Sequence, residues 1–162
     1  MQHLTHIFGP VFDARSRVLI LGSFPSAMSR AQQFYYGHPR NRFWPVIASV
    51  LGEPVPETVA ERRAMVLRRG VALWDAIEEC DIQGSSDASI RNAVPTDLSR
   101  ILEVAPIRAI FVNGAAAARV YDRYQRPRTG REALRLPSTS PANAAWSLER
   151  LIEAWRAVME FL

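Results

Sequence analysis

Four short apolar segments, separated by helical or irregular stretches, constrain the fold of this chain most strongly. They lie at residues 17–22, 71–74, 107–113 and 133–138. Nearly continuous apolar runs of this length are typical of strands that are buried on both faces of a sheet. Strands that alternate with helices predict a parallel sheet covered on both sides. We therefore expect an α/β fold, a three-layer α/β/α sandwich with a central four-stranded parallel sheet, in a single domain over residues 1–162.

The spacing of apolar residues and the helix-stop signals predict the elements between these strands. The expected helices cover residues 43–51, 57–69, 96–104 with Thr96 as N-cap, 114 to about 124, and 141 or 142 to 162. Residues 23–42 and 79–95 show no clear period, so we expect a long ordered loop and an irregular segment there. Such folds bind ligands at the carboxyl ends of their strands, and these loops leave from those ends, so we expect the site there.

The basic side chains are all arginine, because the 20 Lys and Arg residues include no lysine, and the formal net charge is +4. One guanidinium group can bind two phosphate oxygens at once, so an arginine-rich chain with a net positive charge suits a polyanionic partner. A compositional bias that replaces Lys with Arg is the alternative explanation. Without lysine, no side-chain amine is present to form a Schiff base.

Cysteine content and hydropathy exclude several classes of protein. The single cysteine, Cys80, has no partner for an internal disulfide or for a cysteine-based metal site. No apolar run reaches the roughly 18 residues of a membrane span, and residues 1–10 lack the pattern of a secretion signal. We therefore expect a cytoplasmic protein with no membrane contact, no metal and no other cofactor.

Three motifs follow the predicted strands: LGSFPS at residues 21–26, FYYGHPRNRFWP at 34–45 and LPSTSPAN at 136–143. The first two resemble the Gly-x-x-Pro and His-Pro-x-Asn-Arg-Phe-Trp motifs of mismatch-specific uracil and thymine DNA glycosylases, and the third is similar to their DNA-facing loop. The forms GSFPS, YYGHPRN and PSTSPAN most resemble the hypoxanthine-DNA (deoxyinosine) glycosylase branch of the uracil-DNA glycosylase superfamily. This likeness extends over the whole chain.

The resemblance implies a monofunctional DNA glycosylase that flips a deaminated base out of double- or single-stranded DNA and hydrolyses its glycosidic bond. Hypoxanthine is the first expected target and uracil the second, and we expect a monomer. One alternative is a mismatch-specific uracil or thymine DNA glycosylase, and another is a nucleic-acid-binding module without catalysis. A serine hydrolase that uses Ser23 or Ser26 is disfavoured because the Gly-x-Ser-x-Gly elbow is absent.

The expected catalytic residues differ from those of the related families at one position. Where the relatives carry an amide or carboxylate that positions water, this chain has Phe24, which cannot hold water. The resemblance to the hypoxanthine branch implies that Asn41 takes this role, since an amide oxygen can orient a water molecule without acting as a general base. His38 and the backbone N–H groups near Ser23 and Phe24 are candidates to stabilise the departing base. The alternative for Asn41 is a cap of the following helix.

Base recognition requires a stacking face and a group that reads the base edge. By resemblance Tyr36 stacks on the flipped base, with Phe34 and Tyr35 as alternatives or as core residues. Asn113 is expected at the pocket floor, where its amide offers a donor to a carbonyl and an acceptor to the adjacent N–H of a deaminated base. This discrimination requires that neighbouring groups stop the amide from flipping.

The remaining expected contacts are with the DNA backbone. Ser138, Thr139 and Ser140 are expected to bind phosphates. Asn143 is also expected to contact DNA, but Pro141 and Asn143 are poor wedges, so the intercalating residue stays open. Arg40 and Arg42 are expected either to bind phosphate or to be solvated surface charges. Segments 74–75 and 85–92 also match the hypoxanthine branch. There Asp75 is expected to orient a pocket group, and Asp87 and Ser89 to fix the loop, which are structural roles.

Overall fold

The central sheet of the computed structural model, which describes residues 1–162, is four-stranded and parallel, with the strand order β3-β2-β6-β7. Its strands are β2 (Val18–Gly22), β3 (Val71–Asp75), β6 (Ala109–Asn113) and β7 (Ala133–Leu136). Every residue of β2 and β3 is buried, whereas the edge strand β7 is partly exposed. The predicted fold class is confirmed, and each predicted strand segment contains one strand of this sheet.

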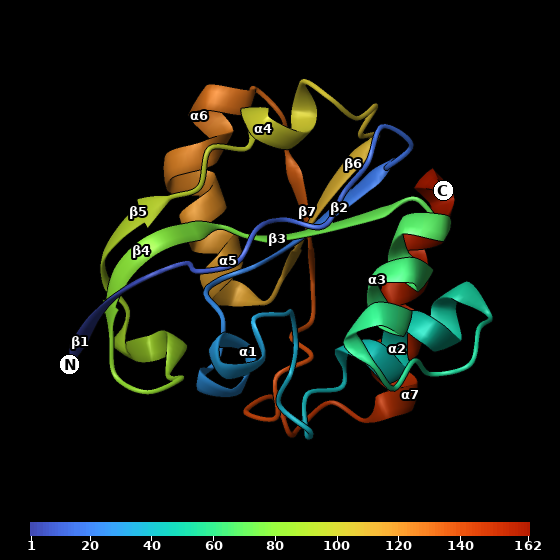
Figure 1. The fold of residues 1–162 in the computed structure, drawn as a ribbon, viewed down its shortest axis with the longest axis horizontal. Helices are drawn as coiled ribbons and strands as arrows, with labels where there is room; N and C mark the ends of the chain where they lie inside the picture. Colours follow the sequence, from blue (N-terminus) through green and yellow to red (C-terminus); the bar gives the residue numbers. More distant parts are fainter.

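Helices cover both faces of the central sheet (Figure 1). One side carries α2 (Phe43–Leu51), α3 (Val59–Arg68) and α7 (Leu148–Trp155), which continues as the 3-10 helix η3 (Arg156–Phe161). The other side carries α5 (Ala115–Val120), the π-helical turn η2 (Tyr121–Gln125) and α6 (Arg126–Thr129). Short helices α1 (Ala27–Gln32) and α4 (Ser99–Leu102) lie near opposite ends of the strands. None of these helices combines the length and the apolar character that crossing a membrane requires.

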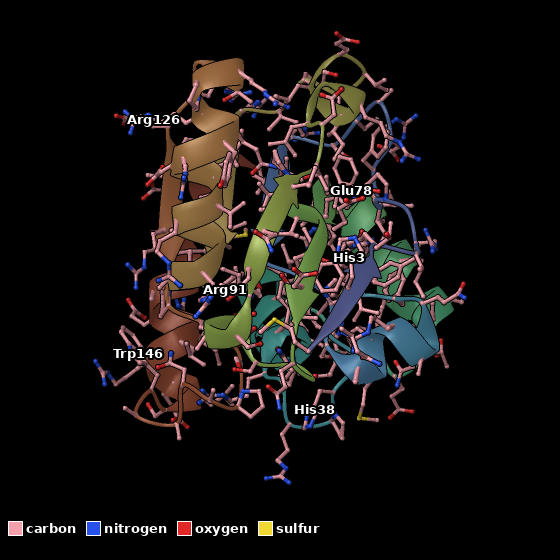
Figure 2. The ribbon with its side chains drawn as sticks, turned by 90° about the vertical axis from the view of Figure 1, so that its left-hand side faces the viewer. His3, His38, Glu78, Arg91, Arg126 and Trp146 are labelled. Carbon is pink, nitrogen blue, oxygen red and sulfur yellow. The ribbon has the colours of Figure 1, made fainter.

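A second sheet, which the sequence analysis did not predict, stands beside the first. It is antiparallel with the order β1-β4-β5, from β1 (Gln2–Thr5), β4 (Ile77–Ile82) and β5 (Arg91–Pro95). Figure 2 looks onto this sheet, with His3, Glu78 and Arg91 labelled. The prediction of an irregular segment at residues 79–95 is therefore wrong. Two register shifts in the pairing of β4 with β5 break the alternation of apolar and polar residues that identifies a strand.

Three further predictions, one of a loop and two of helix boundaries, also need correction. The loop at residues 23–42 contains α1, whose N-cap Ser26 accepts from the backbone N–H of Ser29. The closing helix begins at Leu148 after its N-cap Ser147, and residues 141–147 form turns instead. Thr96 is not an N-cap, because α4 begins at Ser99.

Thr96 instead belongs to a buried polar cluster at the end of β3. Its hydroxyl donates to the carbonyl of Asp75 at 2.8 Å, and the side-chain amide of Gln125 donates to the carbonyls of Ala76 and Thr96. Backbone carbonyls left unpaired in the interior would cost free energy, so these bonds hold the turn between β3 and β4 in one geometry. The cluster therefore fixes the backbone at Asp75 through hydrogen bonds to the carbonyls of Asp75 and Ala76.

Replacement of Trp155 by alanine is expected to reduce the free energy of unfolding by about 3–5 kcal/mol, the usual cost of a large buried aromatic residue. Its side chain is 0 % exposed and packs edge-to-face on Phe43, and its indole N–H donates to the carbonyl of Pro137 at 3.0 Å. Urea denaturation measures the loss. The matched control is Trp146→Ala at a partly exposed site, for which a loss of at most about 1 kcal/mol is expected. Equal losses for both variants would contradict the role of Trp155 as the link between α7, α2 and the loop after β7.

Candidate functional site

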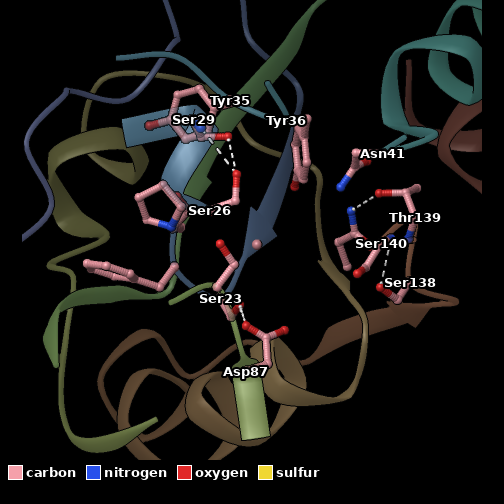
Figure 3. Close-up of a pocket in the computed structure, with 16 residues that line it drawn as sticks. Ser23, Ser26, Ser29, Tyr35, Tyr36, Asn41, Asp87, Ser138, Thr139 and Ser140 are labelled. Carbon is pink, nitrogen blue, oxygen red and sulfur yellow. Dashed lines mark hydrogen bonds between the residues drawn. The ribbon is translucent and has the colours of Figure 1, made fainter. Parts of the chain in front are cut away.

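A pocket of about 100 Å³ opens at the carboxyl ends of β2, β3 and β6, beside the loop after β7 (Figure 3). Eight residues singled out in the sequence line it: Ser23, Phe24, Tyr36, Asn41, Asn113, Ser138, Thr139 and Ser140. Two acidic residues, Asp75 and Asp87, line it as well. The structure thus brings the three sequence motifs together at the edge of the sheet where the loops were expected to meet.

Gly22, the last residue of β2, makes room at the centre of this edge for the side chains of two other residues. It pairs in register with Asp75 of β3, and a Cβ atom at Gly22 would lie 2.5 Å from Oδ1 of Asp75 and 3.2 Å from the Tyr36 hydroxyl oxygen. Real Cβ atoms do not approach other atoms so closely. Glycine is therefore the residue that lets the Asp75 carboxylate and the Tyr36 hydroxyl approach the end of β2.

The Asn113 side chain is held in one orientation by two hydrogen bonds with Thr139. The backbone N–H of Thr139 donates to Oδ1 at 3.1 Å, and Nδ2 donates to the Thr139 hydroxyl at 3.0 Å. A backbone N–H can only donate, so the amide oxygen must face it and the amide does not flip. The second Nδ2 hydrogen is not used by Thr139, and the Tyr36 hydroxyl lies near the Asn113 side chain. The amide is therefore held against flipping, as the proposed recognition of a base by Asn113 requires, and its NH₂ group faces in a known direction.

Thr139 itself lies in the interior. Its side chain is 0 % exposed, so in this structure its hydroxyl does not reach a phosphate as the sequence analysis expected. Ser138 and Ser140 are only partly buried, and the Ser138 hydroxyl accepts from the backbone N–H of Ser140 at 3.1 Å. The loop therefore turns its two serines toward the pocket mouth and uses its threonine to orient Asn113.

Tyr36 has a strained backbone and a buried hydroxyl. Its φ angle is 54°, in the left-handed region that a bulky residue rarely adopts. Its ring stacks on Phe43 with centroids 4.0 Å apart and planes 16° apart. The hydroxyl is buried near the side chains of Asp75 and Asn113. Burial, together with the Asp75 carboxylate, raises the pKa of Tyr36 far above its ordinary value, although the interaction with Asn113 opposes this shift. The phenol therefore stays neutral, and Phe43 holds the ring against the pocket.

Asn41 binds the first N–H of α2 from the position before the N-cap Arg42, which is close to the capping role considered for it from the sequence. Its Oδ1 accepts from the backbone N–H of Phe43 at 2.9 Å, at the start of α2, while the residue also lines the pocket. An amide oxygen has two lone pairs, so this bond leaves one lone pair and the whole NH₂ group free of recorded bonds. Figure 3 shows Asn41 on the same side of the pocket as Tyr36 and Thr139. The cap fixes the direction of the side chain without using up its hydrogen-bonding capacity.

His38 is not brought into the pocket lining. Its Nδ1 accepts from the backbone N–H of Arg40 at 3.1 Å, and its carbonyl accepts from the backbone N–H of Asn41. In Figure 2 His38 lies at the lower edge of the molecule, away from the small sheet. In this conformation His38 shapes the loop that carries Asn41.

Ser23 and Phe24 line the pocket in different ways. The Ser23 hydroxyl donates to Oδ1 of Asp87 at 2.8 Å, which ties the end of β2 to the turn that contains Asp87. The Phe24 ring belongs to a small core cluster with Ile77 and Cys80. Asp87 belongs to an exposed turn, yet its carboxyl faces Ser23, and burial raises the pKa of the carboxyl although the bond from Ser23 opposes this shift. Asp87 thus fixes the loop, as its segment suggested.

The basic residues and Asn143 lie outside the lining. The guanidinium group of Arg42 donates to the carbonyl of Asn143 at 2.9 Å and to the carbonyl of Trp146. The Asn143 amide donates to the carbonyl of Ser138 at 2.9 Å. Arg40 is exposed, without a recorded side-chain bond. Arg42 therefore holds the loop after β7 close to the motif at residues 34–45. Arg40, in the same motif, is exposed to solvent.

One buried pair of side chains beside the pocket was not predicted from the sequence. Nε2 of His6 and Oδ2 of Asp75 are 2.8 Å apart, and their side chains are 1 % and 5 % exposed. His6 follows β1 and Asp75 ends β3, so the partners are 69 residues apart. No local pattern could have identified His6, whereas Asp75 was visible as a polar residue at the end of an apolar strand. No group of three or more His, Cys, Asp or Glu side chains lies where it could hold a metal ion.

Comparisons with known proteins place the chain in a family. The model of the uracil DNA glycosylase superfamily matches residues 10–159. The chain is 36 % identical over 153 residues to a hypoxanthine DNA glycosylase of Methanosarcina acetivorans, covering 93 % of this chain and 95 % of that protein. It is 33 % identical over 109 residues to a hypoxanthine DNA glycosylase of Methanosarcina barkeri, covering 66 % of this chain and 69 % of that protein.

A solved structure supports the same relationship. A solution NMR structure of a candidate uracil DNA glycosylase from Methanosarcina acetivorans superposes with a TM-score of 0.78 at 30 % identity, covering 94 % of this chain and 96 % of that chain. This agreement concerns the fold over nearly the whole length of both chains.

Replacement of Gly22 by alanine is expected to destabilise the protein by about 1–3 kcal/mol, because the added Cβ overlaps the Asp75 carboxylate and the neighbours must shift. Urea denaturation measures the change. The control is Gly9→Ala, whose Cβ would make an ordinary contact of 3.5 Å with Arg100, and for which a change within about 0.5 kcal/mol is expected. If Gly22→Ala were as stable as the control, the close approach of Asp75 to the end of β2 would be disproved.

Proposed function

The chain belongs to the uracil DNA glycosylase superfamily, and from this premise we propose that it excises deaminated bases from DNA, hypoxanthine first and uracil second. The observation that carries the proposal is the convergence of three motifs, at residues 21–26, 34–45 and 136–143, on one pocket. Both Methanosarcina relatives are named for hypoxanthine. The proposed reaction is hydrolysis of the N-glycosidic bond, without a lyase step because the chain has no lysine.

The position of the pocket requires that the base leave the DNA stack. The lining residues lie at strand ends and in the loop after β7, and we propose that a base reaches them only when it is flipped out of the duplex. A net charge of +4 favours a polyanionic substrate. We propose that the protein acts as a monomer. Ser138 and Ser140 are the proposed phosphate contacts at the pocket mouth, with Arg40 beside them on the second motif.

The proposed chemistry is the departure of the base through an oxocarbenium-like transition state. The leaving base gains negative charge, and the free N–H of the fixed Asn113 amide is placed to donate to a carbonyl of that base. Phe24 has no polar group for water. Asn41 has an unused lone pair and an unused NH₂ group, and we propose that these hold the attacking water, which a dissociative path needs only to be positioned.

Tyr36 is the proposed stacking platform. Its ring is supported on one side by Phe43, with centroids 4.0 Å apart, and the residue lines the pocket. Aromatic rings bind flipped bases through their faces. A ring supported from behind and fixed by a constrained backbone loses little conformational freedom when a base stacks on it. The strained conformation of Tyr36 is consistent with such a preorganised role.

A cleavage assay tests the proposed function. Duplexes that contain one hypoxanthine, uracil, xanthine or mismatched thymine are incubated with the protein and then heated in alkali, which breaks the strand at an abasic site. We expect breaks with hypoxanthine, fewer with uracil, and none with an undamaged duplex. Breaks with mismatched thymine alone would favour the mismatch-specific alternative. No breaks with any duplex, together with salt-sensitive DNA binding, would replace the proposal with a binding module without catalysis.

Two substitutions of Asn41 separate its proposed catalytic role from its role as a cap. Asn41→Ala is expected to slow single-turnover excision by about 100-fold or more, because the water loses its position, while DNA binding is kept. Asn41→Ser keeps an oxygen that can accept from the Phe43 backbone N–H, so it is expected to preserve stability and still lose the chemical step. Full activity of the serine variant would show that Asn41 acts only as a cap.

A further inference from the structure

The buried carboxylate of Asp75 has no role in the reaction as derived so far. We propose that Asp75, oriented by His6, is the acceptor that reads the ring N–H created by deamination, and that it distinguishes hypoxanthine from adenine. This inference rests on the proposed function, since it concerns how the same pocket recognises its base. Asp75 would contact the substrate directly, whereas His6 would act as a positioning residue.

The geometry leaves one oxygen of Asp75 directed toward the pocket. The residue is 4 % exposed and lines the pocket, and its Oδ2 is paired with Nε2 of His6 at 2.8 Å. Oδ1 has no recorded hydrogen bond and lies 2.5 Å from the position that a Cβ of Gly22 would occupy. A carboxylate only accepts hydrogen bonds, so Nε2 of His6 carries the proton between them. His6 thus fixes the rotation of the carboxylate and leaves Oδ1 facing the gap at Gly22.

Deamination changes the hydrogen-bonding pattern of a purine edge at two adjacent positions. In adenine, the exocyclic amine donates and N1 accepts. In hypoxanthine, O6 accepts and N1–H donates. A pocket that selects hypoxanthine therefore needs a donor for O6 beside an acceptor for N1–H. Uracil presents the same pattern, a ring N–H flanked by carbonyls, which agrees with its place as the second target.

Asn113 supplies the donor, and Asp75 supplies the stronger acceptor. The Asn113 oxygen accepts from the backbone N–H of Thr139 and its nitrogen donates to the Thr139 hydroxyl, which leaves one hydrogen and one lone pair of the amide. The unpaired oxygen of a carboxylate accepts more strongly than the second lone pair of an amide oxygen that is already bonded. Asp87 is less suited, because its carboxyl accepts from Ser23 and belongs to an exposed turn. Asp75 is therefore the buried acceptor that we assign to N1–H.

The sheet places these two groups on either side of the gap. β3 and β6 both pair with β2, so Asp75 and Asn113 end the strands that flank Gly22. The Tyr36 hydroxyl also lies near Gly22, and a base edge that enters beside it meets an acceptor from one neighbouring strand and a donor from the other. Adenine in the same place would direct its N1 lone pair at a carboxylate. Sites built to bind an N–H reject an analogue that lacks it by about 10⁴–10⁵-fold, because their buried polar groups are left unpaired.

Binding to duplexes that resist cleavage tests the assignment. A 2′-fluoroarabino sugar disfavours the oxocarbenium ion, so the intact base is retained and affinity is measured directly. The two probes carry hypoxanthine, or unsubstituted purine, which has a bare N1 and no O6. We expect Asp75→Asn to weaken binding of the hypoxanthine probe by about 10–100-fold, as for a lost charge-assisted bond. Binding of the purine probe is expected to stay the same or to tighten.

The outcomes separate the inference from the proposed function. If wild-type protein binds the hypoxanthine probe no better than an undamaged duplex, the proposed function fails. If wild-type protein prefers hypoxanthine and Asp75→Asn keeps that preference, the function stands and the role of Asp75 is overturned. Equal losses for both probes would show that Asp75 only supports the fold. Thermal melting of the variant, compared with wild type, shows whether it is folded.

A second pair of variants tests the role of His6 and leaves the Asp75 carboxylate in place. His6→Leu removes the donor to Asp75 and is expected to reduce the preference for hypoxanthine over purine by about 10-fold, within the range for one hydrogen bond to a charged group. His6→Gln keeps a side-chain N–H and is expected to restore most of the preference. If His6→Leu kept the full preference, the positioning role of His6 would be refuted. If Asp75→Asn does not fold, the His6 variants test the role of Asp75 instead, because they change only the hydrogen bond that orients its carboxylate.

Discussion

The register of three parallel strands is the constraint on which the site depends. Gly22 lies opposite Asp75, and the next pair along β2 joins Leu21 to Val112 of β6. Successive side chains of a strand point to opposite faces, so a shift by one residue would turn Asp75 away from the pocket and bury a different residue there. Complete burial of β2 and β3 makes such a shift costly. The hydrophobic core and the chemistry of the pocket are therefore set by the same alignment of strands.

Much of the fold could be predicted because its signals are local. The apolar runs of β2, β3 and β6 stand out without any knowledge of their neighbours, and α2 and α3 agree closely with the predicted helices. The small antiparallel sheet could not be found in this way. Its strand β1 is mostly exposed, and β4 pairs with β5 through shifted register, so neither shows a clean alternation.

The same distinction applies to the site. Tyr36, Asn41 and Asn113 could be singled out because each belongs to a motif or strand end that is visible in a single stretch of sequence. The pairing of His6 with Asp75 could not, because it joins residues 69 positions apart. The motif around Thr139 was recognised, but its burial was not, because the sequence does not show that its hydroxyl turns inward to Asn113. Sequence patterns identified which segments meet, and only the structure showed which atoms remain free.

The small sheet also ties the beginning of the chain to the pocket. β1, which leads directly to His6, pairs with β4, so that Gln2 lies opposite Ile82. In the central sheet, Val18 of β2 pairs with Ala109 of β6, which closes a loop of similar length. The entropy of closing such long loops opposes both pairings. The polar floor of the pocket is therefore complete only when both sheets have formed, because Asp75 comes from one and His6 follows a strand of the other.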